Sequence, residues 1–270
     1  MNQQRLSTFK TEGKLGGAEF SHDGKYVAIL GAEDKHDPAV GRLFLGESKT
    51  GKIKNWLPNL NSHVSDVEWA NNSNTLYFIN NVGTKSEVNR IKVGKSKFST
   101  QVEAGKYIAS QLSISDSDKT VIFKGDTAKH PGEVIMLRGG NKTTRLTDSN
   151  PWLAERKLAK QETVNFTARD GVKLDGVLVY PLDYKKGQTY PLIMTVHGGP
   201  ESHDKDGWIT RYSRPAQMAA GKGYAVFHPN YRGSTGKGVV HSKLGQNDYA
   251  GKEFNDLIDA KTHLVEMGLV

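Results

Sequence analysis

Short β-branched or aromatic runs recur through the first 150 residues, and clusters of Gly, Asn, Asp and Ser separate them. Such runs between turn-forming residues are typical of β-strands. No long segment in this part has the 3.6-residue periodicity of an amphipathic helix. The pattern therefore predicts an all-β first part, with its clearest strands at residues 26–30, 76–79 and 120–123.

A repeat underlies these three runs. Each run is preceded by an apolar strand end and a polar turn, and the strand ends Phe20, Trp69 and Ile114 are 49 and 45 residues apart. This period suits four-stranded propeller blades, and Asp, Asn and Gly suit the turns because they tolerate the left-handed conformation. We expect a partial β-propeller of about three blades in residues 1–150, and an antiparallel sandwich is the alternative. Because propellers have about four to eight blades, we also expect blades before Met1 or another element that closes the ring.

The pattern changes near residues 147–152, where strands begin to alternate with stretches of helical character. Residues 153–160 have helical propensity, and a final helix is expected from about Ala250 to Met267, where apolar residues fall at three- and four-residue spacing. Strands alternating with helices are typical of an α/β domain with parallel strands. We expect this domain in residues 151–270, with strands at 162–168, 173–180, 192–196 and 224–227 and a further helix at 215–220.

Composition narrows the function classes. The 270 residues contain no cysteine, which excludes disulfides, thiolate metal sites and a cysteine nucleophile. The net charge of +8 is spread thinly, with 21 basic and 16 acidic residues in 1–150 and 16 and 13 in 151–270, so a diffusely charged surface is favoured over a nucleic-acid site. No apolar stretch is long enough for a membrane span. The polar start is not a secretory signal as written, and the compartment stays open between cytoplasm and periplasm.

The clearest candidate chemistry lies in residues 195–200, which read TVHGGP. Glycines let a substrate approach the backbone closely and let a turn adopt a positive φ. In α/β-hydrolases, an HGGG-type motif after the third strand gives a backbone N–H to the oxyanion of the tetrahedral intermediate. Each such donor lowers the barrier by about 3–4 kcal/mol. Because the motif follows the third strand of the predicted domain, His197, Gly198 and Gly199 form a candidate oxyanion turn; a plain strand-to-loop turn is the alternative.

The nucleophile that such a turn would serve is expected in a Gly-x-Ser-x-Gly elbow between a strand and a helix. No such pentapeptide occurs in the 270 residues. The nearest stretch is RGSTG at 232–236, but residues 237–241 have the character of another loop. Ser234 is therefore disfavoured as a nucleophile, and we expect the glycines around it to shape a loop that packs near the site.

Phosphate-binding motifs do not fit the same loop. Gly238 follows Lys237 where a P-loop needs Ser or Thr, and His241 stands where a dinucleotide fingerprint needs its third Gly. A metal site is also disfavoured, because none of the nearby histidines forms a His-x-x-x-His pair on a helix. Solvated or hydrogen-bonded loop histidines are expected instead at His197, His203, His228 and His241.

Two acidic residues lie three positions apart on the predicted final helix, Asp256 and Asp259. Paired carboxylates can perform acid–base chemistry, but on the outside of a helix they are more simply part of a solvated face. We therefore expect both carboxylates to face solvent.

In their order along the chain, these features resemble the prolyl oligopeptidase family of serine peptidases, especially its dipeptidyl-peptidase and acylaminoacyl-peptidase branch. The resemblance covers essentially the whole chain and is most specific over residues 144–270. It implies β-propeller blades followed by the N-terminal part of an α/β-hydrolase domain. The stretches that carry it are FSHDGKYVAIL, RLTDSNPW, Arg169-Asp170-Gly171, Val196-His197-Gly198-Gly199-Pro200 and Asn230-Tyr231-Arg232-Gly233-Ser234.

The resemblance implies hydrolysis of peptide bonds through Ser, Asp and His, with peptide substrates and without a metal or organic cofactor. Some members use a Tyr hydroxyl at the position of His197, so a histidine there points to backbone donors. By the same resemblance, Tyr231 and Arg232 would lie close to the active site and bind substrate, and Asp256 matches a position with a structural role. A homo-oligomer of the full-length form is compatible with the resemblance, which implies no nucleic acid and no membrane.

In the family, the serine elbow follows the final helix, and the Asp and His come later still. All three would lie beyond Val270. We therefore expect the 270-residue chain to be inactive by itself, and to expose a sheet edge and an apolar face. Two alternatives stay open: a non-catalytic propeller binding module with a vestigial hydrolase segment, and a lipase-like esterase, against which the repeat argues.

Overall fold

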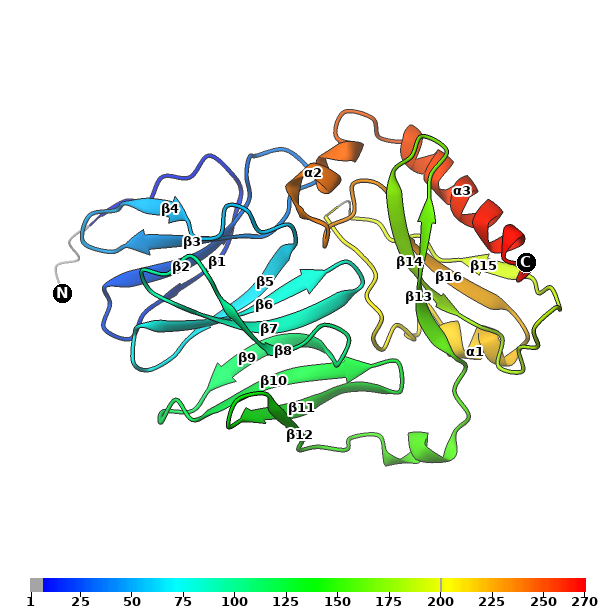
Figure 1. The fold of residues 1–270 in the computed structure, drawn as a ribbon, viewed down its shortest axis with the longest axis horizontal. Coiled ribbons are helices and arrows are strands. Elements are labelled where there is room, and N and C mark those ends of the chain that lie inside the picture. Colours follow the sequence, from blue (N-terminus) through cyan, green and yellow to red (C-terminus); the bar gives the residue numbers. More distant parts are fainter. Residues whose placement is uncertain (1–6, 200) are drawn as a thin grey trace.

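The computed structural model describes residues 7–199 and 201–270. Its first part consists of three four-stranded antiparallel sheets that lie side by side (Figure 1). The strands follow one another within each sheet, as in a meander. The first sheet contains β1 (Leu15–Phe20), β2 (Tyr26–Gly31), β3 (Arg42–Glu47) and β4 (Ile53–Asn55); the second β5 (His63–Trp69), β6 (Thr75–Val82), β7 (Lys85–Lys92) and β8 (Ser99–Val102); and the third β9 (Ile108–Ile114), β10 (Thr120–Thr127), β11 (His130–Arg138) and β12 (Lys142–Arg145).

The repeat found in the sequence corresponds to one hairpin in each sheet. Phe20, Trp69 and Ile114 each end the first strand of their sheet. In the turns that follow, the residue at the same place adopts a positive φ of 69°, 55° and 58° at Gly24, Ser73 and Asp118. The turns therefore share one backbone geometry, which Gly and Asp tolerate better than most residues.

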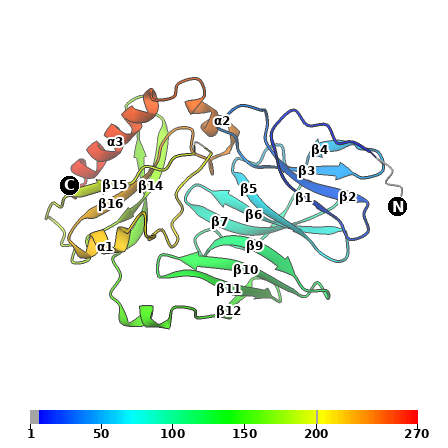
Figure 2. The same ribbon diagram turned by 180° about the vertical axis from the view of Figure 1, so that it is seen from behind.

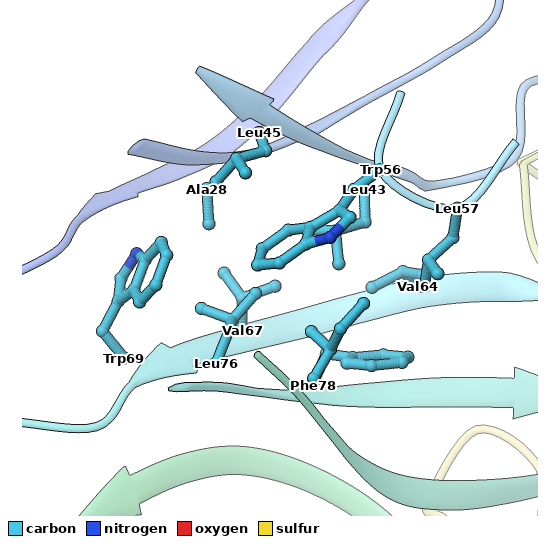
Figure 3. Packing of buried hydrophobic residues seen from close by; sticks show 11 residues of the cluster. Ala28, Leu43, Leu45, Trp56, Leu57, Val64, Val67, Trp69, Leu76 and Phe78 are labelled. Atoms are coloured by element: carbon cyan, nitrogen blue, oxygen red, sulfur yellow. The ribbon is translucent and has the colours of Figure 1, made fainter. Parts of the chain in front are cut away.

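Neighbouring sheets are joined by buried side chains and by bonds from one sheet to the backbone of the next. Figure 3 shows the cluster between the first and second sheets, where Trp56 and Trp69 lie with ring centroids 6.2 Å apart. The indole of Trp69 is fully buried and donates to the Glu19 carbonyl at 2.9 Å. In the same way, Asp66 Oδ2 accepts from the Leu112 amide of the third sheet at 2.8 Å.

The second part is built on one mixed sheet in the order β13-β14-β16-β15. Only β15 and β16 run parallel, while β14 pairs antiparallel with both β13 and β16, so the expected parallel sheet is restricted to one strand pair among the described residues. Its elements are η1 (Pro151–Glu155), β13 (Gln161–Thr167), β14 (Lys173–Val179), β15 (Leu192–Met194), α1 (Ala216–Gly221), β16 (Ala225–Asn230), α2 (Gly238–Ser242), η2 (Lys243–Gly245) and α3 (Lys252–Glu266).

Two local expectations were wrong. The helix predicted at 153–160 is only the short 3₁₀ turn η1, after which the backbone becomes extended at Arg156. Ala159 instead bonds the side chain of Gln217 through both its amide and its carbonyl, so a tertiary contact overrides local propensity. Conversely, residues 237–241, expected as a loop, contain the single-turn helix α2.

Helix α3 packs along the mixed sheet of the second part, with Phe166, Phe227 and Leu264 in one buried cluster. Seen from behind, it crosses the sheet on the side away from α1 (Figure 2). Its pattern of apolar residues was predicted correctly as helical, but the buried face is Asp256, Ala260 and Leu264. Phe254 and Ile258 remain more than half exposed.

Candidate active site

The candidate oxyanion turn begins where β15 ends. Thr195 still follows the sheet, because its amide donates to the Phe227 carbonyl at 2.8 Å. The chain then leaves the sheet, and Gly199 adopts a φ of +132°, which only glycine adopts without strain. His197 is buried, whereas Gly198 and Gly199 are exposed. Within residues 7–199 and 201–270, neither glycine amide has a hydrogen-bond acceptor, and a Cβ on Gly198 would meet no atom within 4 Å.

Three side-chain contacts with residues of the loop after β16 hold this turn. The Tyr231 hydroxyl donates to the His197 carbonyl at 2.7 Å, and the two rings stack with centroids 4.6 Å apart. His197 Nε2 lies 2.9 Å from Ser234 Oγ. Burial is the main cause that lowers the pKa of His197, so its imidazole is neutral at pH 7. A proton on Nδ1, which faces the Gly198 carbonyl at 3.4 Å, leaves Nε2 to accept the Ser234 hydroxyl.

The Ser234–His197 contact has the distance of a nucleophile–base pair. Ser234 is nevertheless only 1% exposed, and it lies four residues beyond the end of β16 rather than on a strand-to-helix elbow. The other nitrogen of His197 faces a backbone carbonyl, not the carboxylate that orients a catalytic histidine. The pair is therefore suited to fixing the turn, and this agrees with the expectation that the loop packs near the site.

The neighbouring Arg232 is fixed by two carboxylates. Its Nε and Nη2 bond Asp256 at 2.8 and 2.6 Å, its Nη1 and Nη2 bond Asp170 at 2.8 and 3.0 Å, and its amide also donates to Asp256. Asp256 is fully buried, so the expected solvated face was wrong for this residue. The same hydrogen bonds raise the pKa of Arg232 and lower that of Asp170. The guanidinium thus has four of its five N–H donors occupied by these carboxylates, and a substrate contact by Arg232 stays a prediction.

Asp259 makes a second, parallel clamp. It accepts both the amide and the guanidinium of Arg169, with Nη2 at 2.8 Å from Oδ1. Its side chain is largely covered, so a solvated face was wrong here too. The spacing of Asp256 and Asp259 contained the signal, because residues three apart share one helix face. That face meets the turn with Arg169 and Asp170 and the loop with Arg232, three segments that the sequence had singled out separately.

The histidines near the turn are more deeply buried than expected. His228 lies on β16 rather than in a loop, is fully buried, and has no hydrogen-bond partner for either nitrogen in the described structure. His203 Nδ1 pairs with Thr235 Oγ1 at 2.7 Å. Burial lowers the pKa of His203 to about 3 and that of His241 to about 4. In the part of the chain that the structure describes, no group of three or more His, Asp or Glu side chains is arranged to hold a metal ion.

The loop after the turn is attached to all three sheets of the first part, a contact that no local sequence pattern predicts. Glu201 accepts from the Ala39 amide at 3.1 Å and pairs with Lys14, both next to the first sheet. The Asp206 amide donates at 2.8 Å to the carbonyl of Thr84, in the turn between β6 and β7 of the second sheet. The Trp208 amide donates to Asp126 Oδ1 in the third at 2.7 Å. Residues 201–208 therefore link the turn to the propeller-like part.

Comparison with known proteins adds three findings. Residues 210–270 match the model of the prolyl oligopeptidase family. The chain is 30% identical over 193 residues to the "Uncharacterized peptidase YuxL" of Bacillus subtilis, covering 71% of this chain and 28% of that protein. It is 26% identical over 261 residues to "Dipeptidyl-peptidase 5" of Porphyromonas gingivalis, covering 93% of this chain and 37% of that protein.

Among solved structures, the uncomplexed acylaminoacyl peptidase of Pyrococcus horikoshii matches with a TM-score of 0.75 and 21% identity, over 92% of this chain and 38% of that one. At this identity the match supports the fold: propeller-like four-stranded sheets followed by the start of an α/β-hydrolase domain. The chain spans about a third of the length of the relatives it matches. No helix among the described residues is both long and apolar enough to cross a membrane.

Proposed function

Because the chain belongs to the prolyl oligopeptidase family of peptidases, we propose that it is part of a serine peptidase that hydrolyses oligopeptides or N-terminal dipeptidyl or acyl-peptide substrates. The observation that supports this most strongly is the turn at residues 197–199. Gly198 and Gly199, in the loop after β15, are exposed, and their amides have no acceptor within residues 7–199 and 201–270, while buried neighbours hold the backbone around them.

In the proposed reaction, a serine attacks the carbonyl carbon of the peptide bond and the carbonyl oxygen becomes negatively charged. The amides of Gly198 and Gly199 donate to that oxygen, which stabilises the transition state by about 3–4 kcal/mol for each donor. His197 contributes through its backbone position rather than as a base, because its imidazole is buried against Tyr231 and Ser234. Because the imidazole of His197 is neutral, no positive charge is buried between Tyr231 and Ser234.

Residues 1–270 contain no Gly-x-Ser-x-Gly sequence. We therefore propose that the serine, and the Asp and His that activate it, belong to sequence beyond Val270, and that residues 1–270 alone do not turn over a substrate. A turn that polarises a carbonyl does not by itself attack it. The buried position of Ser234 supports the same conclusion.

The test is a labelling experiment with a fluorophosphonate, which reacts with activated serines. The purified 270-residue chain should remain unlabelled, and its Ser234→Ala variant should behave identically. Stoichiometric labelling of the chain, lost in Ser234→Ala, would mean that Ser234 is a nucleophile and that the proposal is wrong. A protein extended beyond Val270 should label at one serine in a Gly-x-Ser-x-Gly elbow, and its failure to label would favour a non-catalytic binding module.

A further inference from the structure

A cavity of about 250 Å³ lies between the third sheet and the loop that follows the oxyanion turn. Its walls are formed by β9 and β10 on one side and by residues 203–214 on the other. In Figure 1 this loop is the yellow segment between β15 and α1, on the side of the mixed sheet that faces the propeller-like part. The cavity is small compared with typical ligand pockets of about 300–1,000 Å³, so it suits a single residue or a small ion.

Positive charge dominates the lining. Four cationic side chains contribute to it, against two carboxylates; each carboxylate accepts a hydrogen bond through Oδ1, while Asp204 Oδ2 has no hydrogen-bond partner in the described structure. Asp126 Oδ1 accepts the Trp208 amide at 2.7 Å. Asp204 Oδ1 accepts from Arg214 at 3.0 Å, and its Oδ2 lies 3.8 Å from His228. The four cationic residues are Lys124, Lys205, Arg211 and Arg214.

Whereas Lys124 and Arg211 are exposed, Lys205 is half-buried. Burial lowers its pKa from the ordinary value, and among the described residues no carboxylate lies within 4.0 Å of its ammonium group. Its charge also contributes to the lowered pKa values of His63 and His203, so the ammonium lies near both imidazoles. The charge of Asp126 offsets part of the cost of burying this ammonium from more than 4.0 Å away, and a bound anion would offset more of it.

A second group in the lining also has an unused donor position. His203 Nδ1 pairs with Thr235, while its Nε2 is buried and has no partner in residues 7–199 and 201–270. If Thr235 donates to Nδ1, the proton of the neutral imidazole sits on Nε2, where it is available to a ligand oxygen. His203 thus lines the same small cavity as Lys205 and has one buried nitrogen without a partner in the described part of the chain.

We propose that this cavity is a carboxylate-binding subsite, with Lys205 as the central donor and the exposed Arg211 at its mouth. The proposal rests on the proposed function for the source of the carboxylate, which is a peptide with a free C-terminus. Because residues 201–208 connect the cavity wall to the oxyanion turn, a peptide anchored here by its carboxylate would be held beside the same loop as the turn. The subsite would then favour short peptides with an unblocked C-terminus.

The test measures binding of two matched ligands to the 270-residue chain by isothermal titration calorimetry. N-acetyl-dialanine with a free carboxylate should bind at least about tenfold more tightly than its C-terminal amide, since a hydrogen bond to a charged group contributes a factor of this size. Lys205→Met should abolish that preference. Lys222→Met is the control, because Lys222 is exposed at the end of α1 and does not line the cavity.

Equal binding of the acid and the amide, or an unchanged preference in Lys205→Met, would overturn the proposal. Saturable binding of inorganic phosphate without any binding of the peptide acid would also overturn it, since the anion would then have another source. If Lys205→Met does not melt cooperatively, the same two ligands are compared with Arg211→Gln, which should reduce the preference for the acid. Arg211 is exposed, so we expect this variant to fold. The measurement needs no nucleophile, so its result is independent of the labelling experiment.

Discussion

The loop after β16 makes two sets of contacts, at Arg232 and at His197, which differ in charge and in the number of donors they leave unused. At Arg232, one guanidinium pairs with two carboxylates through four of its five N–H donors, so this clamp has little left to offer a ligand. At His197, neutral groups hold the backbone, and the amides of Gly198 and Gly199 have no acceptor among the described residues. The ion pairs of Arg232 with Asp170 and Asp256, the charged clamp, therefore give rigidity. The contacts of His197 with Tyr231 and Ser234, the neutral corner, leave the glycine amides available for chemistry.

The charged clamp should give the largest change in stability. Asp256→Ala leaves the buried Arg232 with only the partly exposed Asp170, and breaking a buried pair from one side costs about 3–5 kcal/mol. Urea denaturation followed by circular dichroism measures the loss. Asp259→Ala is the matched variant one turn along the same helix, and it should destabilise less because Arg169 is half exposed. Equal losses for the two variants would contradict the clamp.

The buried imidazoles should make the free energy of unfolding depend on pH. The folded-state pKa values of His203 and His241 are lowered to about 3 and about 4, whereas the unfolded chain takes up these protons near pH 6.5. Stability is therefore fully present above pH 6.5 and falls as the pH drops toward 4, by on the order of a few kcal/mol.

Urea denaturation at intervals between pH 7.5 and 4 measures this slope. His241→Gln should flatten it, and the exposed His36→Gln should leave it as it is. The carboxylates of Asp170 and Asp259 have lowered pKa values, so their contribution is present above their ordinary value of 3.8 and is lost only below it. A slope that begins only below pH 4 would therefore assign the pH dependence to carboxylates instead.

Removing a contact in the neutral corner should lower the free energy of unfolding less than breaking the charged clamp does. Ser234→Ala removes the partner of His197 Nε2 in a buried place, which costs about 1–3 kcal/mol. The exposed Ser213→Ala should change the free energy of unfolding by less than about 0.5 kcal/mol. A loss from Ser234→Ala as large as that from Asp256→Ala would show that the two supports do not differ in strength.

Substitutions on the outer face of α3 should change the free energy of unfolding least, but they should change the binding of a hydrophobic dye. Phe254 and Ile258 are more than half exposed on the side of the helix opposite the clamp. Replacing both by Lys should alter the free energy of unfolding by less than about 1 kcal/mol and reduce the binding of a hydrophobic dye. Unchanged dye binding would indicate that the apolar surface lies elsewhere, for example at Ile193 on β15.

Local patterns predicted much of the fold. The three β runs, the turns with left-handed residues and the strand before the glycine turn all follow from short stretches whose chemistry acts locally. The helix expected at 153–160 did not form, because Ala159 pairs with Gln217, a residue far along the chain. The burial of Asp256 likewise depends on Arg232 and Asp170, and no local pattern reports such a distant partner.

The candidate site shows the same limit. His197, Gly198 and Gly199 could be selected because the motif follows a strand in a recognisable order, although their role remains a prediction. The contact between Ser234 and His197 could not be foreseen, because it depends on how two loops 37 residues apart fold over the edge of the sheet. The same is true of the cavity at Lys205, whose walls come from both parts of the chain.

The most direct test of the central claim is the catalytic constant of a protein extended beyond Val270, with and without the Gly198 amide. Gly198→Pro removes that donor and should lower kcat on a peptide substrate by about 10²–10³-fold, with little change in KM. Gly221→Ala, at the end of α1 and with no atom within 4 Å of the added Cβ, should leave kcat unchanged. An unaltered kcat in a folded Gly198→Pro protein would contradict the assignment of this turn to the oxyanion.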